Sequence, residues 1–291
     1  MTTKKWIQQN TERLDGRTVA ISGATGGLGR ELVFLLASLG ADLILLDRNL
    51  AKSAALEDKV MERFPACRVR LITVDMEDLE AVKHAAETLE ADPPDYLILN
   101  AGAYHIPRHS CSTGLDNVYQ INFVSPYYLA RRLLPLLRAR GGKVVAVGSI
   151  AHTYTKFRPD HVDFADCPKS SKAYGNAKRQ LMFALWGLAE RGEGLAITHP
   201  GITLTGITAH YPKVIYALIK HPMKIIFMKP RRACLCILRG LFADCGRNEW
   251  IGPRFFGVWG LPQKTRLNTC SEEEADAICQ AADTLWERLG T

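Results

Sequence analysis

Short apolar runs alternate with amphipathic stretches over the first two hundred residues of the chain. The runs are rich in Val, Ile and Leu and predict buried strands, whereas the stretches between them have the apolar spacing of helices. The predicted strands span 18–22, 42–46, 68–74, 96–99, 143–148 and 195–199. The predicted helices span 28–39, 49–64, 77–90, 115–138 and 173–191.

Strands that alternate with helices need crossover connections, which produce a parallel sheet covered on both faces. We therefore predict an α/β fold, a Rossmann-type doubly wound parallel sheet with helices on both faces, in a single domain over residues 1–291. The alternation stops after His199. Residues 201–230 lack a strand period and predict a lid-like insertion. Beyond it we predict a helix at 231–242, a last strand at 249–252 and a C-terminal helix within 271–291.

The amino-acid composition limits the kinds of binding partner that we expect for this protein. The 291 residues are 47% hydrophobic and 23% charged, which is ordinary for a globular protein. The net charge of +7 is concentrated in residues 211–232 and comes with no nucleic-acid-binding signature, so we expect no nucleic-acid partner. The eight cysteines form no C-x-x-C pair, so we expect reduced thiols and no metal site.

The sequence predicts no membrane span. It has no run of eighteen apolar residues, and its start, Met1 to Trp6, lacks a secretory signal, so we expect a cytoplasmic protein. The lysines of the segment 211–232 are nevertheless suited to anionic lipid, and peripheral membrane contact is a hypothesis.

A glycine-rich loop, SGATGGLG, connects the first predicted strand to the first long helix. Its glycines let the backbone turn sharply and approach a pyrophosphate, which would rest on free N–H groups of the helix N-terminus. The spacing is G-x-x-x-G-x-G rather than G-x-G-x-x-G, and an ordinary strand-to-helix turn is the alternative. The candidate cofactor-binding residues in this loop are Ser22, Gly23, Thr25, Gly27, Leu28 and Gly29.

Acidic residues follow the second and third predicted strands. Asp47 can accept hydrogen bonds from the ribose hydroxyls of NAD and would repel the 2′-phosphate of NADP, whereas Arg48 would favour that phosphate. We favour NAD as the cofactor, with NADP as the alternative. Asp75, next to Met76, is placed to reach the adenine. The alternative for Asp47 is a turn or helix cap, and the alternative for Asp75 is an N-cap of the helix at Glu77.

Tyr174 and Lys178 lie four residues apart at the start of a helical pattern, which places a phenol and an ammonium on one helix face. A cation about 4 Å away is worth ~4 kcal/mol at intermediate dielectric, roughly three pKa units. We therefore expect Lys178 to lower the pKa of Tyr174 enough for proton transfer. Ser149 follows a predicted strand upstream. Taken singly, these residues could be helix surface and loop.

In this order, the features resemble the short-chain dehydrogenase/reductase family. The motifs that carry the resemblance along most of the chain are, in order, Gly23, Gly27 and Gly29, Asn100-Ala-Gly102, Asn122, Ser149, Tyr174 with Lys178, and Pro200-Gly201 with Thr205. Each motif is weak alone, and the six in register are specific.

The resemblance implies an NAD(P)-dependent oxidoreductase. Tyr174 would exchange a proton with the substrate, and Ser149 would donate a hydrogen bond to the developing oxyanion. Lys178 would also bind the nicotinamide ribose, and Asn122 would hold a water in a proton relay. Further cofactor-binding residues by this resemblance, besides Tyr174 and Lys178, are Asn100, Ala101, Gly102, Pro200, Gly201, Thr203 and Thr205.

The chain departs from the family pattern in three places. Ser22 stands where threonine is usual, and Leu99 stands where a first asparagine is often found. The interval between the serine and the tyrosine is longer than in compact members. Residues 151–170 look like the longer loop of retinol-dehydrogenase-like members, which would line or cover the substrate pocket, and we expect histidines such as His152 at the loop surface.

The substrate is expected to be a bulky hydrophobic alcohol or ketone, such as a steroid, a retinoid or a lipid-like compound. Residues 214–228 are apolar with interleaved lysines, and part of this segment should close over an apolar ligand. The resemblance also implies a homodimer or homotetramer built on the helices 115–138 and 173–191. A nucleotide-binding regulatory protein without turnover is the alternative from another class, and an epimerase or dehydratase is the alternative among enzymes.

Overall fold

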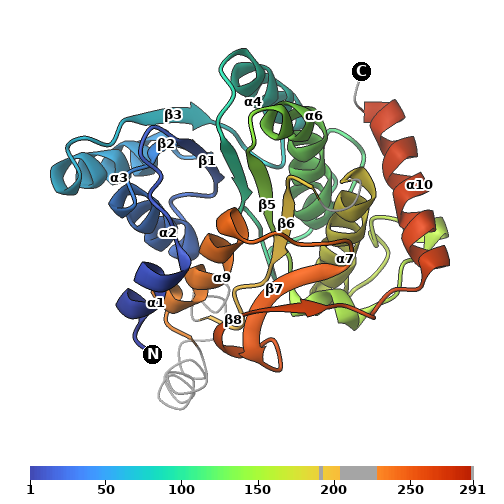
Figure 1. The fold of residues 1–291 in the computed structure, drawn as a ribbon. Helices are drawn as coiled ribbons and strands as arrows, with labels where there is room; N and C mark the ends of the chain where they lie inside the picture. Colours follow the sequence, from blue (N-terminus) through green and yellow to red (C-terminus); the bar gives the residue numbers. More distant parts are fainter. Residues whose placement is uncertain (190–192, 204–227, 290–291) are drawn as a thin grey trace, which may run out of the picture.

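The computed structural model describes residues 1–189, 193–203 and 228–289. Most of the predicted insertion 201–230, and with it Thr205, lies outside the described residues. All the described strands belong to one sheet, in the order β3-β2-β1-β4-β5-β6-β7-β8 (Figure 1). The strands are β1 (Thr18–Ser22), β2 (Asp42–Asp47), β3 (Val69–Thr73), β4 (Tyr96–Leu99), β5 (Lys143–Val147), β6 (Leu195–Thr198), β7 (Glu249–Phe255) and β8 (Trp259–Arg266).

Helices cover both faces of this sheet, which confirms the predicted Rossmann-type α/β fold (Figure 1). Helices α1, α2, α3 and α9 lie on one face, and α4, α6 and α7 lie on the other. The helices are α1 (Thr3–Asn10), α2 (Gly27–Ser38), α3 (Leu50–Arg63), α4 (Leu79–Ala91), α5 (Asn117–Tyr119), α6 (Ser125–Ala139), α7 (Ser170–Leu188), α9 (Pro230–Phe242) and α10 (Glu272–Leu289). Short π and 3-10 turns are η1 (Gln120–Val124), η2 (Ile150–Tyr154) and η3 (Pro159–His161).

The central strands are apolar along their whole length because both of their faces are buried. In β1, Val19 and Ile21 face the cluster that includes helices α2 and α9, whereas Ala20 faces the cluster that includes α4 and α6. Each fully buried aliphatic side chain of this kind contributes roughly 2 kcal/mol to folding. The sheet is therefore a rigid platform for the loops at its edges.

The last part of the sheet differs from the predicted single final strand. We expected a final strand at 249–252, but β7 continues to Phe255 and is followed by β8, which pairs with it antiparallel. Both strands contain a proline, and Pro253 pairs with Pro262. Because proline cannot donate to a ladder, it lowers the strand signal in a sequence and is tolerated here near the sheet edge.

The predicted helix 115–138 is also interrupted. Helix α5 passes into the π turn η1 before α6 begins at Ser125. Within η1, the side-chain amide of Asn122 donates to the carbonyl oxygen of Val118 at 2.8 Å. This side-chain bond takes the place of regular helical pairing at the turn, and such π turns often occur at functional sites.

Helix α10 packs on α7 and reaches α6. Trp286 lies 5.1 Å from the ring of Tyr128, and Arg131 forms an ion pair with Asp283. The oligomer expected through α6 and α7 stays a prediction, and its interface would have to include the outer side of α10. None of the described helices is long and apolar enough to cross a membrane.

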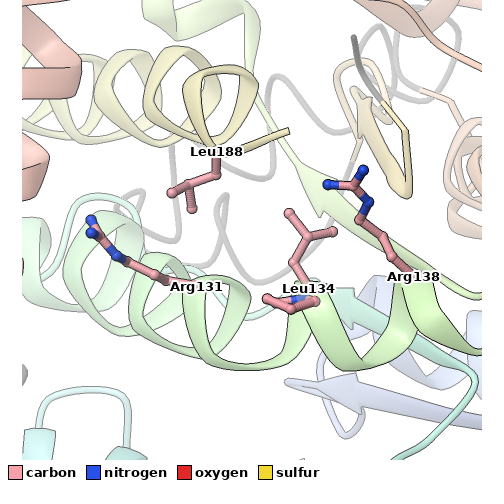
Figure 2. Close-up of a pocket in the computed structure, with 5 residues that line it drawn as sticks. Arg131, Leu134, Arg138 and Leu188 are labelled. Atoms are coloured by element: carbon pink, nitrogen blue, oxygen red, sulfur yellow. The ribbon is translucent and has the colours of Figure 1, made fainter. Parts of the chain in front are cut away.

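A cavity of about 310 Å³ lies between α6 and the end of α7 (Figure 2). Its walls include two arginines that already have acidic partners, Arg131 with Asp283 and Arg138 with Glu193. Helix α6 ends just before β5 starts, so this cavity lies toward the edge of the sheet where the strands begin. It contains none of the predicted site residues.

Candidate active site

A larger cavity, of about 820 Å³, lies at the carboxyl ends of the parallel strands. Ligands of doubly wound sheets bind at this edge because the loops that follow the strands meet there. The predicted site residues that line it are Gly23, Thr25, Gly27, Leu28, Gly29, Asp47, Arg48, Asp75, Met76, Asn100, Ala101, Gly102, Ser149, Tyr174, Lys178, Pro200, Gly201 and Thr203. Two predicted residues, Ser22 and Asn122, lie behind this wall.

The glycine loop is tightly packed at the start of α2. Gly23 has a φ of +67°, and a Cβ atom on Gly29 would lie 2.1 Å from the carbonyl oxygen of Gly23. Any side chain at position 29 would therefore displace the loop backbone. The N-cap residue Gly26 makes no side-chain capping bond, so the N-terminal N–H groups of α2 lack a side-chain cap beside the cavity. This geometry suits a phosphate group.

Ser22 has a different place from the one expected. It is buried, and its hydroxyl oxygen accepts hydrogen bonds from the backbone N–H groups of Asn100 at 3.1 Å and Ala101 at 3.0 Å. The Asn100 side chain donates back to the carbonyl oxygens of Ser22 and Gly23, each at 3.0 Å. Ser22 therefore joins the ends of β1 and β4 rather than lining the cavity.

Asp47 ends β2 and faces the glycine loop. Its Oδ1 accepts from the backbone N–H of Thr25 at 3.2 Å and from the Thr25 hydroxyl at 2.9 Å, and its Oδ2 accepts from Ser53 at 3.3 Å. Burial raises the pKa of Asp47, and the bonds from Thr25 partly offset that rise. The N-cap of α3 is Asn49, so the helix-capping alternative for Asp47 is wrong.

Asp75 and Met76 follow β3 at the same edge. The Asp75 carboxylate accepts from the backbone N–H of Glu77 at 3.0 Å, which makes a local turn, and Asp78 is the N-cap of α4. The carbonyl oxygen of Met76 accepts from the Ser125 hydroxyl at 2.7 Å. Asp75 therefore shapes the loop and lines the cavity at the same time.

Asn122 lies buried behind Gly102. Its side chain donates to the carbonyl oxygen of Ala103 at 2.8 Å and accepts from the Ala103 N–H at 3.2 Å. A Cβ atom on Gly102 would lie 2.9 Å from Asn122 Oδ1 and 3.6 Å from Lys178 Nζ. Asn122 thus holds the loop after β4, next to the lysine to which the predicted relay would lead.

Ser149, Tyr174 and Lys178 converge on the cavity from β5 and α7. Lys178 Nζ lies 5.9 Å from the centroid of the Tyr174 ring and donates to the carbonyl oxygen of Val147 at 2.8 Å. A hydrogen bond links the Ser149 hydroxyl to Tyr174. A Cβ atom on Gly175 would lie 2.4 Å from the carbonyl oxygen of Ala151, so the glycine lets α7 approach the loop after Ser149.

Burial has the largest effect on the pKa values of Tyr174 and Lys178, contrary to our expectation. It raises the pKa of Tyr174 to about 12, although the hydrogen bond from Ser149 acts in the opposite direction. Burial also lowers the pKa of Lys178 to about 8. The expected net lowering of the Tyr174 pKa is therefore not found in this geometry, because removing the phenol from water outweighs the contacts that favour the phenolate.

Two tyrosines that the motifs did not single out complete the wall. The ring of Tyr104 lies edge-on to Tyr174 at 5.0 Å, and Tyr154 borders the cavity from η2. Tyr154 belongs to the segment 151–170, part of which lines the cavity as expected. Tyr104 follows the Asn-Ala-Gly element, and its position in the loop five residues after the end of β4 was the available signal.

His199 was another residue without a sequence signal. It lies between β6 and Pro200, borders the cavity and stacks on Trp250 at 5.1 Å with nearly parallel planes. Among the described residues, neither ring nitrogen has a hydrogen-bond partner of acceptable geometry. Burial lowers the pKa of His199 to about 4, so the ring is neutral and serves as a flat wall at physiological pH.

His152 is buried, not at the loop surface where we expected it. Its Nδ1 lies 2.7 Å from the carbonyl oxygen of Ser149, and its Nε2 lies 2.8 Å from the Thr269 hydroxyl. The carbonyl oxygen of His152 accepts from Arg179, which forms a bidentate ion pair with Glu274. The start of α10 thereby supports the loop that carries Ser149.

Among residues 1–189, 193–203 and 228–289, no cluster of three His, Cys, Asp or Glu side chains is arranged to hold a metal ion. The cysteines in these ranges are free thiols. Burial raises the pKa of Cys67 and Cys111 to about 11, so these thiols stay protonated at physiological pH.

The chain is similar in sequence to proteins of known family. Residues 17–158 match the family model described as short chain dehydrogenase. The chain is similar to short chain dehydrogenase rstn4 of Aspergillus nomiae, with 35% identity over 156 residues that cover 50% of this chain and 42% of that protein. It is similar to retinol dehydrogenase 13 of Mus musculus, with 25% identity over 210 residues, 68% of this chain and 61% of that protein.

The match therefore spans less than two thirds of the length of either relative. Among solved structures, the chain is similar to an uncharacterized protein from Mycobacterium paratuberculosis. The two share 24% identity and a TM-score of 0.74, and 96% of each chain is covered. At this identity, the likeness shows a common fold.

Proposed function

Because the chain belongs to the short-chain dehydrogenase/reductase family, we propose that it is an NAD(P)-dependent oxidoreductase that interconverts a hydrophobic secondary alcohol and its ketone. The observation that carries the proposal is the convergence of Ser149, Tyr174 and Lys178 on the cavity that the glycine loop also lines. A phosphate-binding loop and an acid–base group on the same cavity are what such a reaction requires.

Tyr174 is the proposed proton donor in the direction of reduction. When bound, the nicotinamide would supply the hydride to the carbonyl carbon. The phenol keeps its proton at neutral pH because burial raises its pKa to about 12. Its O–H proton passes to the carbonyl oxygen as negative charge develops there, which leaves a phenolate. Oxidation of an alcohol uses the same groups in reverse.

Ser149 and Lys178 stabilise the charges that this transfer creates. The Ser149 hydroxyl can donate a hydrogen bond to the substrate oxygen, because it already reaches the phenol that must contact the same atom. The Lys178 ammonium lies near the face of the phenol ring and favours the phenolate that is left behind. Asn122 keeps the neighbouring loop in place through Ala103.

The loop and Asp47 are proposed to hold the dinucleotide. The pyrophosphate would rest on the N-terminus of α2, with its adenosine ribose toward the end of β2. Oδ1 of Asp47 accepts two bonds from Thr25, whereas Oδ2 accepts one from Ser53 and retains a free lone pair. That lone pair can accept a ribose hydroxyl, which supports NAD as the preferred cofactor, although Arg48 at the same wall favours NADP.

The substrate is proposed to be bulky and apolar, in the class of steroids, retinoids and lipid-like carbonyl compounds. The part of the wall beyond Tyr174 is mostly apolar and aromatic, which suits such a compound. The residues that make up this part are Tyr104, Ile106, Pro107, Ile121, Ile150, Ala151, Tyr154 and Ile202.

The test measures the rate of hydride transfer from the change in nicotinamide absorbance. It uses NADH and NADPH across a panel of hydrophobic ketones. Tyr174→Phe should reduce the rate by at least about 100-fold, the usual contribution of general acid–base catalysis, while binding the cofactor normally. Tyr104→Phe is the matched control, because it removes a hydroxyl from the adjacent ring, and it should keep most of the activity. Near-normal turnover by Tyr174→Phe would show that another group moves the proton.

A further inference from the structure

The hairpin of β7 and β8 ends in an exposed aromatic tip. Phe255 and Trp259 face each other across the turn with ring centroids 5.3 Å apart, and each is nearly half exposed. Phe256, between them, is 93% exposed. We call Phe255, Phe256 and Trp259 the aromatic tip.

Phe256 is unfavourable for the isolated fold in two ways. Its φ is +53°, a left-handed conformation that bulky side chains rarely adopt. Its side chain is almost wholly exposed, so packing against the described residues does not compensate for the strained backbone. An asparagine or glycine would satisfy this turn better. Nothing in the described part of the chain accounts for an aromatic side chain at this position.

The aromatic tip lies beside the main cavity. The backbone N–H of Ile202 donates to the carbonyl oxygen of Val258 at 3.4 Å, and a Cβ atom on Gly201 would lie 2.6 Å from the same oxygen. Ile202 lines the cavity and is itself 36% exposed. The tip thus extends an apolar surface outward from the wall of the candidate active site.

A cationic side chain lies at the aromatic tip. The Arg254 guanidinium lies 5.8 Å from the centroid of the Phe255 ring. From Trp250 to Ser271 the sequence contains three Lys or Arg residues and no Asp or Glu. One of the three, Lys264, is paired with Glu249 at the far end of β7 from the turn. Of these three, Arg254 is therefore the cation beside the tip, because Lys264 and Arg266 lie at the far end of the hairpin.

We propose that the aromatic tip docks onto the surface of an anionic lipid bilayer. Phe and Trp side chains enter the interface between headgroups and acyl chains, and neighbouring cations are attracted to anionic headgroups. The tip is a protrusion rather than a groove, which suits a deformable lipid surface. A second copy of this chain is disfavoured because it would bring the same positive charge to the contact.

The test uses the purified full chain and vesicles of phosphatidylcholine with about 30 mol% phosphatidylserine, in about 0.1 M salt. The chain should cosediment with these vesicles and be released in about 0.5 M salt, where the charges are screened. Of the five tryptophans, Trp259 is the one whose side chain is nearly half exposed, and its fluorescence should shift to shorter wavelength on binding. Trp259→Phe should remove that shift.

Phe256→Asn is the decisive variant. Asparagine tolerates the left-handed φ, so the variant should unfold at no lower temperature than the parent, yet its vesicle affinity should fall roughly tenfold. Met61→Gln is the matched control: Met61 is 50% exposed on α3, near the opposite edge of the sheet, and its loss should not change binding. The readout needs neither cofactor nor turnover and is independent of the proposed reaction.

Three results would overturn the proposal. The first is the absence of cosedimentation at low salt, and the second is unchanged vesicle binding by Phe256→Asn. The third is a dimer of the parent chain in sedimentation analysis that Phe256→Asn dissociates, which would assign the aromatic tip to a second copy instead.

Discussion

The imidazole of His152 lies 2.7 Å from the carbonyl oxygen of Ser149. A carbonyl only accepts, so Nδ1 must carry the proton, and Nε2 must then accept from the Thr269 hydroxyl at 2.8 Å. Burial lowers the pKa of His152, which keeps the ring in this neutral form. The histidine therefore fixes the backbone of the serine without contacting the cavity.

We predict that His152 positions Ser149 for catalysis. His152→Leu should lower kcat by about 10- to 100-fold, because small displacements of a catalytic group have effects of this size, with little change in KM. His152→Asn can still donate from its amide to the Ser149 carbonyl and should recover most of the rate. Steady-state kinetics of both variants is the measurement. Equal losses in the two would indicate a general packing role.

We predict that the Arg179–Glu274 pair supports the fold near this loop. The Arg179 side chain is 2% exposed, and Glu274→Gln leaves its charge buried without a full partner. The free energy of unfolding in urea should fall by roughly 3 kcal/mol. Asp283→Asn, on the same helix, breaks the more exposed pair with Arg131 and should cost less than about 1 kcal/mol. A similar cost for both variants would contradict this assignment.

The same pair should make the protein sensitive to acid. Burial acts to raise the pKa of Glu274, but the hydrogen bonds and charge of Arg179 prevail and hold it below the ordinary value of 4.5. A lowered carboxyl pKa adds stability above the unfolded-state pKa, and that stability is lost as the pH falls through the folded-state pKa. The parent should therefore lose its advantage over Glu274→Gln below pH 4.5, as measured by urea unfolding.

We predict that the rate of ketone reduction depends on the charge of Lys178. Burial lowers the pKa of Lys178 to about 8, so its ammonium is lost as the pH rises through that value, whereas Tyr174 stays protonated to about 12. The rate should be level near neutrality and fall above pH 8. A guanidinium keeps its charge, so any activity of Lys178→Arg should not show this decline up to about pH 10. An unchanged profile in that variant would assign the decline elsewhere.

We predict that Asp47 and Arg48 set the cofactor preference in opposite directions. Asp47→Ser removes the carboxylate that would repel a 2′-phosphate, and Arg48→Ala removes a cation that would bind it. Measured Kd values for NADH and NADPH should shift toward NADPH by about tenfold or more in the first variant and toward NADH in the second. The absence of any shift in Asp47→Ser would exclude Asp47 as the selector.

Much of the fold could be predicted because its signals are local. The strands β1 and β4 and the helix α10 have the predicted bounds or nearly so, since apolar runs and helical spacing need only neighbouring residues. The β8 strand could not be predicted in this way. Its pairing with β7 depends on register across the hairpin, and Pro262 weakens the local strand signal.

The site residues likewise divide into those that local sequence predicts and those that only the fold brings together. Motif spacing identified residues such as Tyr174, Lys178 and Gly29, because a helix turn or a tight loop fixes their relative positions. It missed Tyr104 and His199, which reach the cavity from the segments that follow β4 and β6. It also placed Ser22 at the cavity, whereas its hydroxyl bonds to Asn100 and Ala101 from behind.

By itself, the sequence determined the α/β architecture and which phenol, ammonium and glycine loop would face the edge of the sheet. These follow from periodicity and spacing, which depend on short stretches of chain. Only the tertiary structure decided the electrostatics of the site, because the pKa of Tyr174 depends on how completely distant elements exclude water from it. It also decided that the start of α10 supports Ser149 through Arg179 and His152, because the ion pair of Arg179 with Glu274 joins residues 95 positions apart in the chain.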